Sequence, residues 1–313
     1  MFRAPARAVR LPLLLALVLG CAACSMNDDG ISLIGSRGYE PGEFFTPAHI
    51  AVDRAGFLYV ADTDNHRVQK LTADGEFVDS FGSWGSEPGQ FLGLSGLAVG
   101  GDGAVYTVEF TTHRVQKFSA AGELLTTWGG SGSGPGQFAR PRAIAVAPDD
   151  SVYVADTGNH RIQRFSGDGV WLASWGSEGP RPGEFREVRA VAVDSAGSVW
   201  VADAHNHRVQ KFTADGAFVS EWGERGRSSG AFIFPSGLVV DNVDRVYVAD
   251  RSNYRIQVIA PDGTFEPAIA AGYVSLGRRA IIGPLAWAPG SLYTADRYHH
   301  VVLRHDLQAV EVR

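Results

Sequence analysis

The chain repeats itself every 47 residues over most of its length. A fragment that reads HRVQ or HRIQ marks the repeat, and its relative YRIQ follows in the same register. These fragments begin at His66, His113, His160, His207 and Tyr254. A second fragment, PGEF or PGQF with the weaker form SGAF, begins at Pro41, Pro88, Pro135, Pro182 and Ser229. Because both markers keep one unbroken register, a single structural unit must be used again and again.

One unit, read from Pro135, predicts four short β-strands. AIAVA and SVYVAD are β-branched runs on either side of Pro-Asp-Asp, which is the pattern of a hairpin. RIQRF alternates apolar and polar residues, and a Gly-Asp-Gly turn separates it from VWLASWG. Four strands cannot bury their own faces, so the copies must stack around an axis as propeller blades. We therefore predict an all-β fold, and 313 residues need not mean two domains.

Counting the units gives six blades of four antiparallel strands. The sixth starts near residues 276–277 and has LYTADRYHHVVL in place of VYVADTGNHRIQ. The chain stops at Arg313, before a full fourth strand. Ile34-Gly35 lies 47 residues before Phe81-Gly82, so we predict that an N-terminal strand, residues 31–35, completes the last blade. Such closure removes an exposed sheet edge. In the alternative arrangement, residues 309–312 fill that edge.

The pattern VYVADTGNHRIQRF, preceded by PGQF and a strand that starts at proline, resembles the NHL repeat. The resemblance covers about residues 36–313. The second copy departs from it, because Glu109 replaces the usual aspartate, and the sixth copy is degenerate. The resemblance implies a six-bladed β-propeller of the NHL type. It does not imply one function, because propellers serve as scaffolds, sensors and enzymes.

The N-terminus has the pattern of an export signal. Three arginines precede the apolar run 11–19, which is too short to span a bilayer but suits a signal peptide. The following Val-Leu-Gly-Cys resembles the lipobox of bacterial lipoproteins, which implies that Cys21 receives a lipid. Cys24 is a second possible frame, and a plain secretory signal is the other alternative. We expect a signal peptide over 1–20, a lipidated cysteine and tether over 21–30, and the propeller over 31–313.

This organisation implies a place in the cell. The protein would be exported and would reach the membrane of the bacterial cell envelope only through its lipid anchor. Removal of residues 1–20 takes away three arginines and no acids, so the formal net charge would change from −6 to −9. An acidic chain is a poor partner for nucleic acid, because phosphate binding needs a basic face. We therefore expect no nucleic-acid partner.

Several residues recur in most blades, and a structural role explains them best. Asp62, Asp156, Asp203 and Asp250 each stand five residues before an arginine, and this spacing suggests a charge-assisted hydrogen bond across a short loop. A catalytic residue would appear once or twice, not once per blade. The repeated histidines belong to the same set. The series Trp128, Trp175 and Trp222 is expected to pack between neighbouring blades.

Functional residues are expected on the face that carries the long loops, around the central channel. The position after Pro47 and its equivalents in the 47-residue register holds Ala48, Ser95, Arg142, Arg189, Ser236 and Gly283 in the six blades. Residues that break the repeat here are informative, and arginines gathered at one channel mouth suggest an anion site. The ligand-binding candidates are His49, Arg140, Arg142, Arg186, Arg189 and Arg278. The alternative is a set of solvated surface arginines.

An enzyme is the main alternative to a binding module. Peptidylglycine amidating lyase, which has this kind of propeller, binds zinc through histidines after the same prolines, and no histidine stands at those positions here. His205 with His207, and His299 with His300, could ligate a metal. They are weak candidates, because His207 and His300 are repeated positions with a structural explanation. Lactonases of the gluconolactonase type need inward Glu, Asn and Asp; the hairpin turn explains Asp241 and Asn242, the nearest match.

We therefore expect a binding or scaffold module that holds a protein, a peptide or an anionic ligand on its long-loop face, with no cofactor and without chemistry of its own. A propeller lyase or hydrolase with a non-standard, possibly metal-dependent, channel site is the alternative. An extracellular sensor that signals through a separate partner is a third reading.

Overall fold

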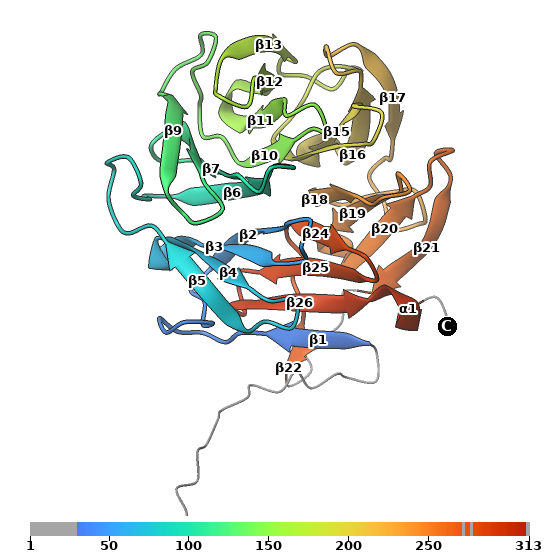
Figure 1. Cartoon of the computed structure of the whole chain (residues 1–313). Helices are drawn as coiled ribbons and strands as arrows, with labels where there is room; N and C mark the ends of the chain where they lie inside the picture. The colour runs from blue at the N-terminus through green and yellow to red at the C-terminus, as the bar shows by residue number, and fades with distance from the viewer. Residues whose placement is uncertain (1–29, 271–272, 276–277, 311–313) are drawn as a thin grey trace, which may run out of the picture.

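The computed structural model describes residues 30–270, 273–275 and 278–310. The predicted signal peptide, Cys21, Cys24 and the start of the sixth repeat at 276–277 lie outside these residues. Six four-stranded antiparallel sheets are arranged in a ring, as predicted (Figure 1). Among the residues that the structure describes, no helix has the length and apolar character needed to cross a membrane.

The blades follow one another along the chain. The first blade consists of β2 (Pro47–Val52), β3 (Leu58–Asp62), β4 (Arg67–Leu71) and β5 (Phe77–Phe81). The second consists of β6 (Leu94–Val99), β7 (Val105–Glu109), β8 (Arg114–Phe118) and β9 (Leu124–Gly129). The third consists of β10 (Ala143–Val146), β11 (Val152–Asp156), β12 (Arg161–Phe165) and β13 (Trp171–Trp175). The next two consist of β14 (Val188–Val193), β15 (Val199–Asp203), β16 (Arg208–Phe212) and β17 (Phe218–Trp222); and β18 (Pro235–Val240), β19 (Val246–Asp250), β20 (Arg255–Ile259) and β21 (Phe265–Ala270).

The sixth blade joins the two ends of the chain. It consists of β24 (Leu285–Ala288), β25 (Ser291–Asp296), β26 (Val301–Asp306) and, on the outside, β1 (Ile31–Ile34). β1 runs antiparallel to β26, with Ile31 opposite His305 and Ile34 opposite Val302. The predicted N-terminal closing strand is therefore confirmed. The alternative, in which residues 309–312 fill this edge, is wrong, because β1 occupies it and a short helix, α1 (Leu307–Val310), follows β26.

The remaining elements are small. β22 (Tyr273–Ser275) and β23 (Arg278–Arg279) pair with each other between the fifth and sixth blades. A single 3-10 turn follows the second strand in four blades, as η1 (Thr63–Asn65), η2 (Thr157–Asn159), η3 (Ala204–Asn206) and η4 (Arg251–Asn253). These turns and the long connections between blades lie on one face of the ring. The hairpin turns between first and second strands and between third and fourth strands lie on the other.

The hydrophobic core is divided among the seams between blades. Between the third and fourth blades, Tyr153 and Ile162 pack against Val191 and Phe212, all of them buried. Second strands such as β11 are buried at every position, because a neighbouring blade covers each face. The predicted tryptophan packing is confirmed: Trp175 lies against Phe212 of the next blade, with ring centroids 6.0 Å apart.

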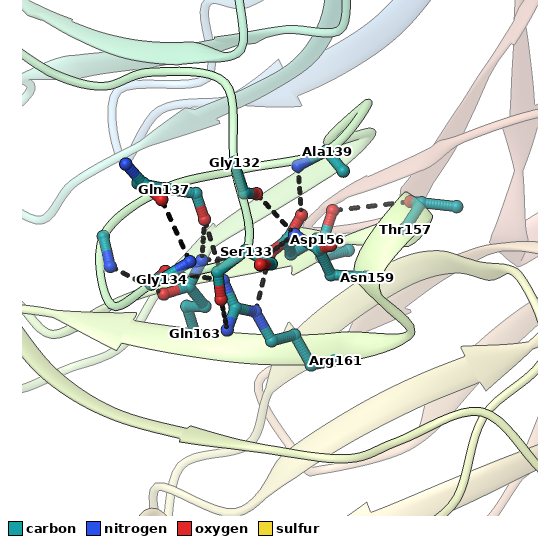
Figure 2. Close-up of polar contacts among 12 residues, drawn as sticks. Gly132, Ser133, Gly134, Gln137, Ala139, Asp156, Thr157, Asn159, Arg161 and Gln163 are labelled. Carbon is teal, nitrogen blue, oxygen red and sulfur yellow. Dashed lines mark hydrogen bonds and ion pairs between the residues drawn. The ribbon is translucent and has the colours of Figure 1, made fainter.

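The repeated polar residues tie each blade to its long loop (Figure 2). In the third blade the buried Asp156 carboxylate accepts hydrogen bonds from the Ala139 N–H (2.7 Å), Asn159 Nδ2 (2.8 Å) and Arg161 Nε (2.7 Å). Gln163 Nε2 also donates to this carboxylate, at 3.0 Å. Glu109 accepts the corresponding bond from Arg114, at 2.7 Å, so the substitution in the second blade keeps the network. The structural role predicted for the Asp–Arg set is confirmed.

Three of the repeated histidines, His113, His207 and His300, join one blade to the next, whereas Nδ1 of His66 and of His160 is buried without a hydrogen-bond partner among the described residues. Each stands in the left-handed backbone conformation after the second-strand turn, as His113 (φ 55°) and His300 (φ 59°) do. Nδ1 of His113 accepts the backbone N–H of Arg140, and Nδ1 of His300 accepts that of Thr46 across the closure, both at 3.0 Å. These bonds hold the start of the next inner strand in place.

Candidate functional site

A cavity opens at the mouth of the central channel on the long-loop face. The position after the first-strand proline lines it in all six blades, as the register predicts. These six residues are Ala48, Ser95, Arg142, Arg189, Ser236 and Gly283. Its volume is about 100 Å³. Small-molecule sites typically measure roughly 300–1,000 Å³, so this mouth admits one chemical group of a larger ligand.

A second ring of residues, which sequence reasoning missed, surrounds the first. It is the position directly after the aspartate or glutamate that ends each second strand, and in four blades this residue lines the mouth. Those four are Thr63, Phe110, Arg251 and Arg297, and the exposed Tyr298 follows Arg297. The 47-residue register contained the signal, because this position is as regular as the one after the proline.

The mouth is strongly cationic. Arg142, Arg189, Arg251 and Arg297 line it, and none of the described residues that line it carries a carboxylate. Four arginines with no acid among them are unusual on a chain whose formal net charge is −6. The local field at this opening therefore attracts anions.

Arg142 is the arginine that most needs a partner. Its side chain is half-buried, and among the described residues its guanidinium makes no hydrogen bond or ion pair. Burial lowers the pKa of Arg142 from its ordinary value, and the nearby positive charge of Arg189 lowers it further. An arginine keeps its proton at any physiological pH, so this side chain remains a charged donor without an acceptor.

Arg189 is partly neutralised. Its guanidinium forms an ion pair with Glu187, whose other carboxylate oxygen lies 2.7 Å from Nε2 of His205. Nε of Arg189 is buried and has no hydrogen-bond partner among the described residues. Glu187 therefore holds Arg189 in position and takes up part of its charge.

Arg251 and Arg297 converge on one tyrosine. Nη2 of Arg251 donates to the Tyr298 hydroxyl at 2.8 Å, and its guanidinium lies 5.5 Å from the centre of that ring. The Arg297 guanidinium lies 6.0 Å from the same ring. Neither guanidinium contacts a carboxylate among the described residues, so both keep their full charge beside the mouth.

A second depression adjoins the mouth over the third and fourth blades. Its volume is about 370 Å³, and Arg142 lines both openings. Arg140 and Arg186 lie on its rim together with Glu178, Glu187 and His205. Four of the predicted ligand-binding arginines, Arg140, Arg142, Arg186 and Arg189, are thus brought together around these two openings.

The other two predicted residues differ. His49 lines the mouth, and its Nδ1 is buried without a hydrogen-bond partner. Burial lowers the pKa of His49 to about 4, so the imidazole is neutral at pH 7. Arg278 lies in β23, and its side chain falls outside the described part of the structure. The neighbouring Arg279 guanidinium lies 5.5 Å from the centre of the Tyr254 ring.

The weak metal candidates have structural partners. His299 replaces the repeated asparagine, and its Nδ1 lies 2.7 Å from the buried Asp296 carboxylate. His207 accepts the Phe234 N–H at 3.3 Å, and His205 contacts Glu187. Within the described ranges, no group of three or more His, Cys, Asp or Glu residues could hold a metal ion. Asp241 accepts the N–H groups of Val243 and Arg245, as its hairpin turn predicts.

Comparison with family models finds the NHL repeat in four segments, residues 46–71, 138–165, 185–212 and 232–259. The chain carries NHL repeats. The matched segments fall in the first, third, fourth and fifth blades of this NHL propeller, and the departing second and sixth copies are the ones left out. No curated protein sequence matches the chain.

Solved structures share the fold of the NHL propeller at low sequence identity. A streptogramin B lyase is 13% identical, with a TM-score of 0.64 over 88% of this chain and 97% of that one. A gluconolactonase from Xanthomonas campestris is 17% identical, with a TM-score of 0.63 over 90% and 92%. A catalytically inactive virginiamycin B lyase from Staphylococcus aureus, with quinupristin, is 15% identical, with a TM-score of 0.60 over 89% and 88%. At these identities the likeness extends to the fold alone.

Proposed function

We propose that this NHL propeller is a binding module that holds an anionic group of its partner at the channel mouth. The observation that carries the proposal is the half-buried guanidinium of Arg142, which lacks an acceptor among the described residues and shares the mouth with three other arginines. A carboxylate or phosphate would supply that acceptor, and the planar guanidinium suits either one.

The energy of such a contact is appreciable. A hydrogen bond to a charged group contributes about 1.5–3 kcal/mol, and about 1.4 kcal/mol corresponds to tenfold in affinity. The other arginines of the mouth add a field that speeds the encounter with an anion. Arginine and exposed aromatic residues are also the residue types enriched at binding surfaces, and Phe110 and Tyr298 supply the latter here.

Calorimetric titration with citrate, a small tricarboxylate, tests this proposal. We expect one citrate per chain at low salt, with at least about tenfold weaker binding to the double variant Arg142→Ala, Arg189→Ala. The control is Arg54→Ala, which removes one positive charge from an exposed hairpin turn on the opposite face. Equal citrate affinity in wild type and double variant would refute the proposal.

A lyase or hydrolase is the second candidate, and His49 is the observation that favours it. This imidazole lines the mouth and has a free Nδ1, as a proton acceptor would. Its pKa of about 4 makes it a weak base at neutral pH, whereas an efficient general base has a pKa near the working pH. The mouth itself offers no carboxylate among its described residues to assist. We therefore place binding ahead of catalysis.

We also propose that the propeller works outside the cytoplasm, as a lipoprotein of the cell envelope anchored through Cys21. The N-terminal pattern supports this location. In that setting the partner would be a protein or peptide of the envelope, held without a cofactor. Metabolic labelling with a fatty acid tests the anchor directly.

A further inference from the structure

The mouth and the second depression share Arg142 in their lining, and we call the two together the arginine track. Arg142 lines both openings, so a ligand bound to its guanidinium lies at the border between them. Their volumes are about 100 and 370 Å³. A ligand that fills both must be extended, because the mouth receives a single group while the depression takes several.

The charge of the arginine track comes from six arginines and two glutamates. The arginines are Arg140, Arg142, Arg186, Arg189, Arg251 and Arg297, and the acids are Glu178 and Glu187. Among the described residues, neither Arg140 nor Arg186 makes a side-chain hydrogen bond or ion pair, and both are exposed. The local excess of positive charge therefore extends beyond the mouth into the depression.

The repeat itself shows that the fold does not require these arginines. At the position of Arg140 the other blades carry Thr46, Gly93, Glu187, Phe234 and Ile281. At the position of Arg186 they carry Phe45, Leu92, Ala139, Ile233 and Ala280. Five of the six blades form without an arginine at each of these two places, so the repeat does not require Arg140 in the third blade or Arg186 in the fourth. A role in recognition explains them.

The apolar part of the lining points to a peptide. Phe110 and Ile281 line the mouth beside the arginines and keep part of their apolar surface accessible, whereas Leu94 and Ile282, which also line it, are fully buried. A side chain of a peptide could cover these apolar groups while neighbouring carboxylates reach the guanidinium groups. An acidic polysaccharide or a nucleic acid presents charge without aliphatic side chains, and so would leave this apolar surface uncovered.

We propose that the arginine track binds an acidic peptide segment of a partner protein in an extended conformation. One apolar side chain enters the mouth, a neighbouring carboxylate pairs with Arg142, and carboxylates further along reach Arg140 and Arg186. This inference rests on the proposed function and names the class of partner for the same site.

Calorimetry with capped peptides that contain one, three or five glutamates around a single leucine tests the inference. In wild type we expect the affinity to rise at least about tenfold from the shortest to the longest peptide, because the longer peptides add carboxylates that reach Arg140 and Arg186. The double variant Arg140→Ala, Arg186→Ala should lose most of that gain. Arg54→Ala should keep it, and peptides with glutamine in place of glutamate should show none.

Three results would overturn this inference, and a fourth would overturn the proposed function as well. The gain with peptide length could persist in the Arg140→Ala, Arg186→Ala variant. An oligogalacturonate of the same charge could bind as tightly as the longest peptide, which would make the ligand a glycan. Citrate could bind at the mouth while the affinity of the peptides does not rise with their length. The proposed function would then stand, and the inference of a peptide ligand would be wrong. If neither citrate nor any peptide binds, both proposals are wrong.

Discussion

His305 makes the stability of the propeller depend on pH in a measurable way. The residue lies in β26, is fully buried, and neither ring nitrogen has a hydrogen-bond partner among the described residues. The equivalent positions in the five other blades are apolar: Leu71, Phe118, Phe165, Phe212 and Ile259. A neutral imidazole can occupy this space, but a protonated one would place an unpaired charge in the core.

The size and sign of the effect follow from the pKa. Burial lowers the pKa of His305 from 6.5 to about 4. The unfolded chain therefore takes up a proton below pH 6.5 while the folded chain does not, and the free energy of unfolding falls as the pH drops from 6.5 towards 4. A shift of this size corresponds to about 3 kcal/mol when the pH reaches the lower value. His49, lowered to about the same pKa, acts in the same direction.

The perturbation is His305→Leu, which installs the residue type found at Leu71. At pH 7.5 we expect the variant to be at least as stable as wild type, because two unpartnered polar atoms leave the core. Urea unfolding of both proteins between pH 7.5 and pH 4.5 measures the difference. The carboxylates titrate alike in the two proteins. The difference in free energy of unfolding between the variant and wild type should therefore grow by about 2–3 kcal/mol in favour of the variant as the pH falls. Parallel pH profiles would refute the reasoning.

Three further predictions concern the network, the closure and the anchor. Asp156→Ala should lower the free energy of unfolding in urea by about 3–5 kcal/mol, because it leaves buried donors without an acceptor, whereas Asp168→Ala, at an exposed ion pair, should lower it by at most about 1 kcal/mol. Equal losses in the two variants would contradict the structural role of the Asp156 network. Ile34→Ala should cost about 2–5 kcal/mol by the same assay if β1 closes the ring, and no loss would argue against closure. Cys21→Ser should abolish fatty-acid labelling in cells, whereas Cys24→Ser should not; the reverse result would move the anchor.

Most of the fold could be predicted because the repeat has a constant length. A constant 47-residue register assigns each residue to an equivalent place in its blade, and four strands per unit allow only stacked blades. The same register predicted the closing strand, since Ile34 stands 47 residues before Phe81. The alignment of the sixth copy sets His299 at the place of the repeated asparagine, but its contact with the Asp296 carboxylate emerges from the structure alone.

The site could be predicted only in part. Register shows that Arg142 and Arg189 share a position at the channel, and the structure places both at the mouth. The register also makes Arg251 and Arg297 equivalent positions, and this was not used to predict the site. Register does not show how side chains pair, because pairing depends on rotamers and distances in space. That Glu187 engages Arg189 while Arg142 has no acceptor emerges from the structure alone.

Photo-crosslinking of the longest acidic peptide reports where a partner lies on the propeller. With a benzophenone in place of the peptide's leucine, we expect crosslinks at the mouth, around Phe110 and Tyr298, and their loss in Arg142→Ala. Crosslinks concentrated on the hairpin turns of the opposite face, such as residues 53–56, would contradict this expectation. So would crosslinks at the mouth that persist unchanged in the Arg142→Ala protein.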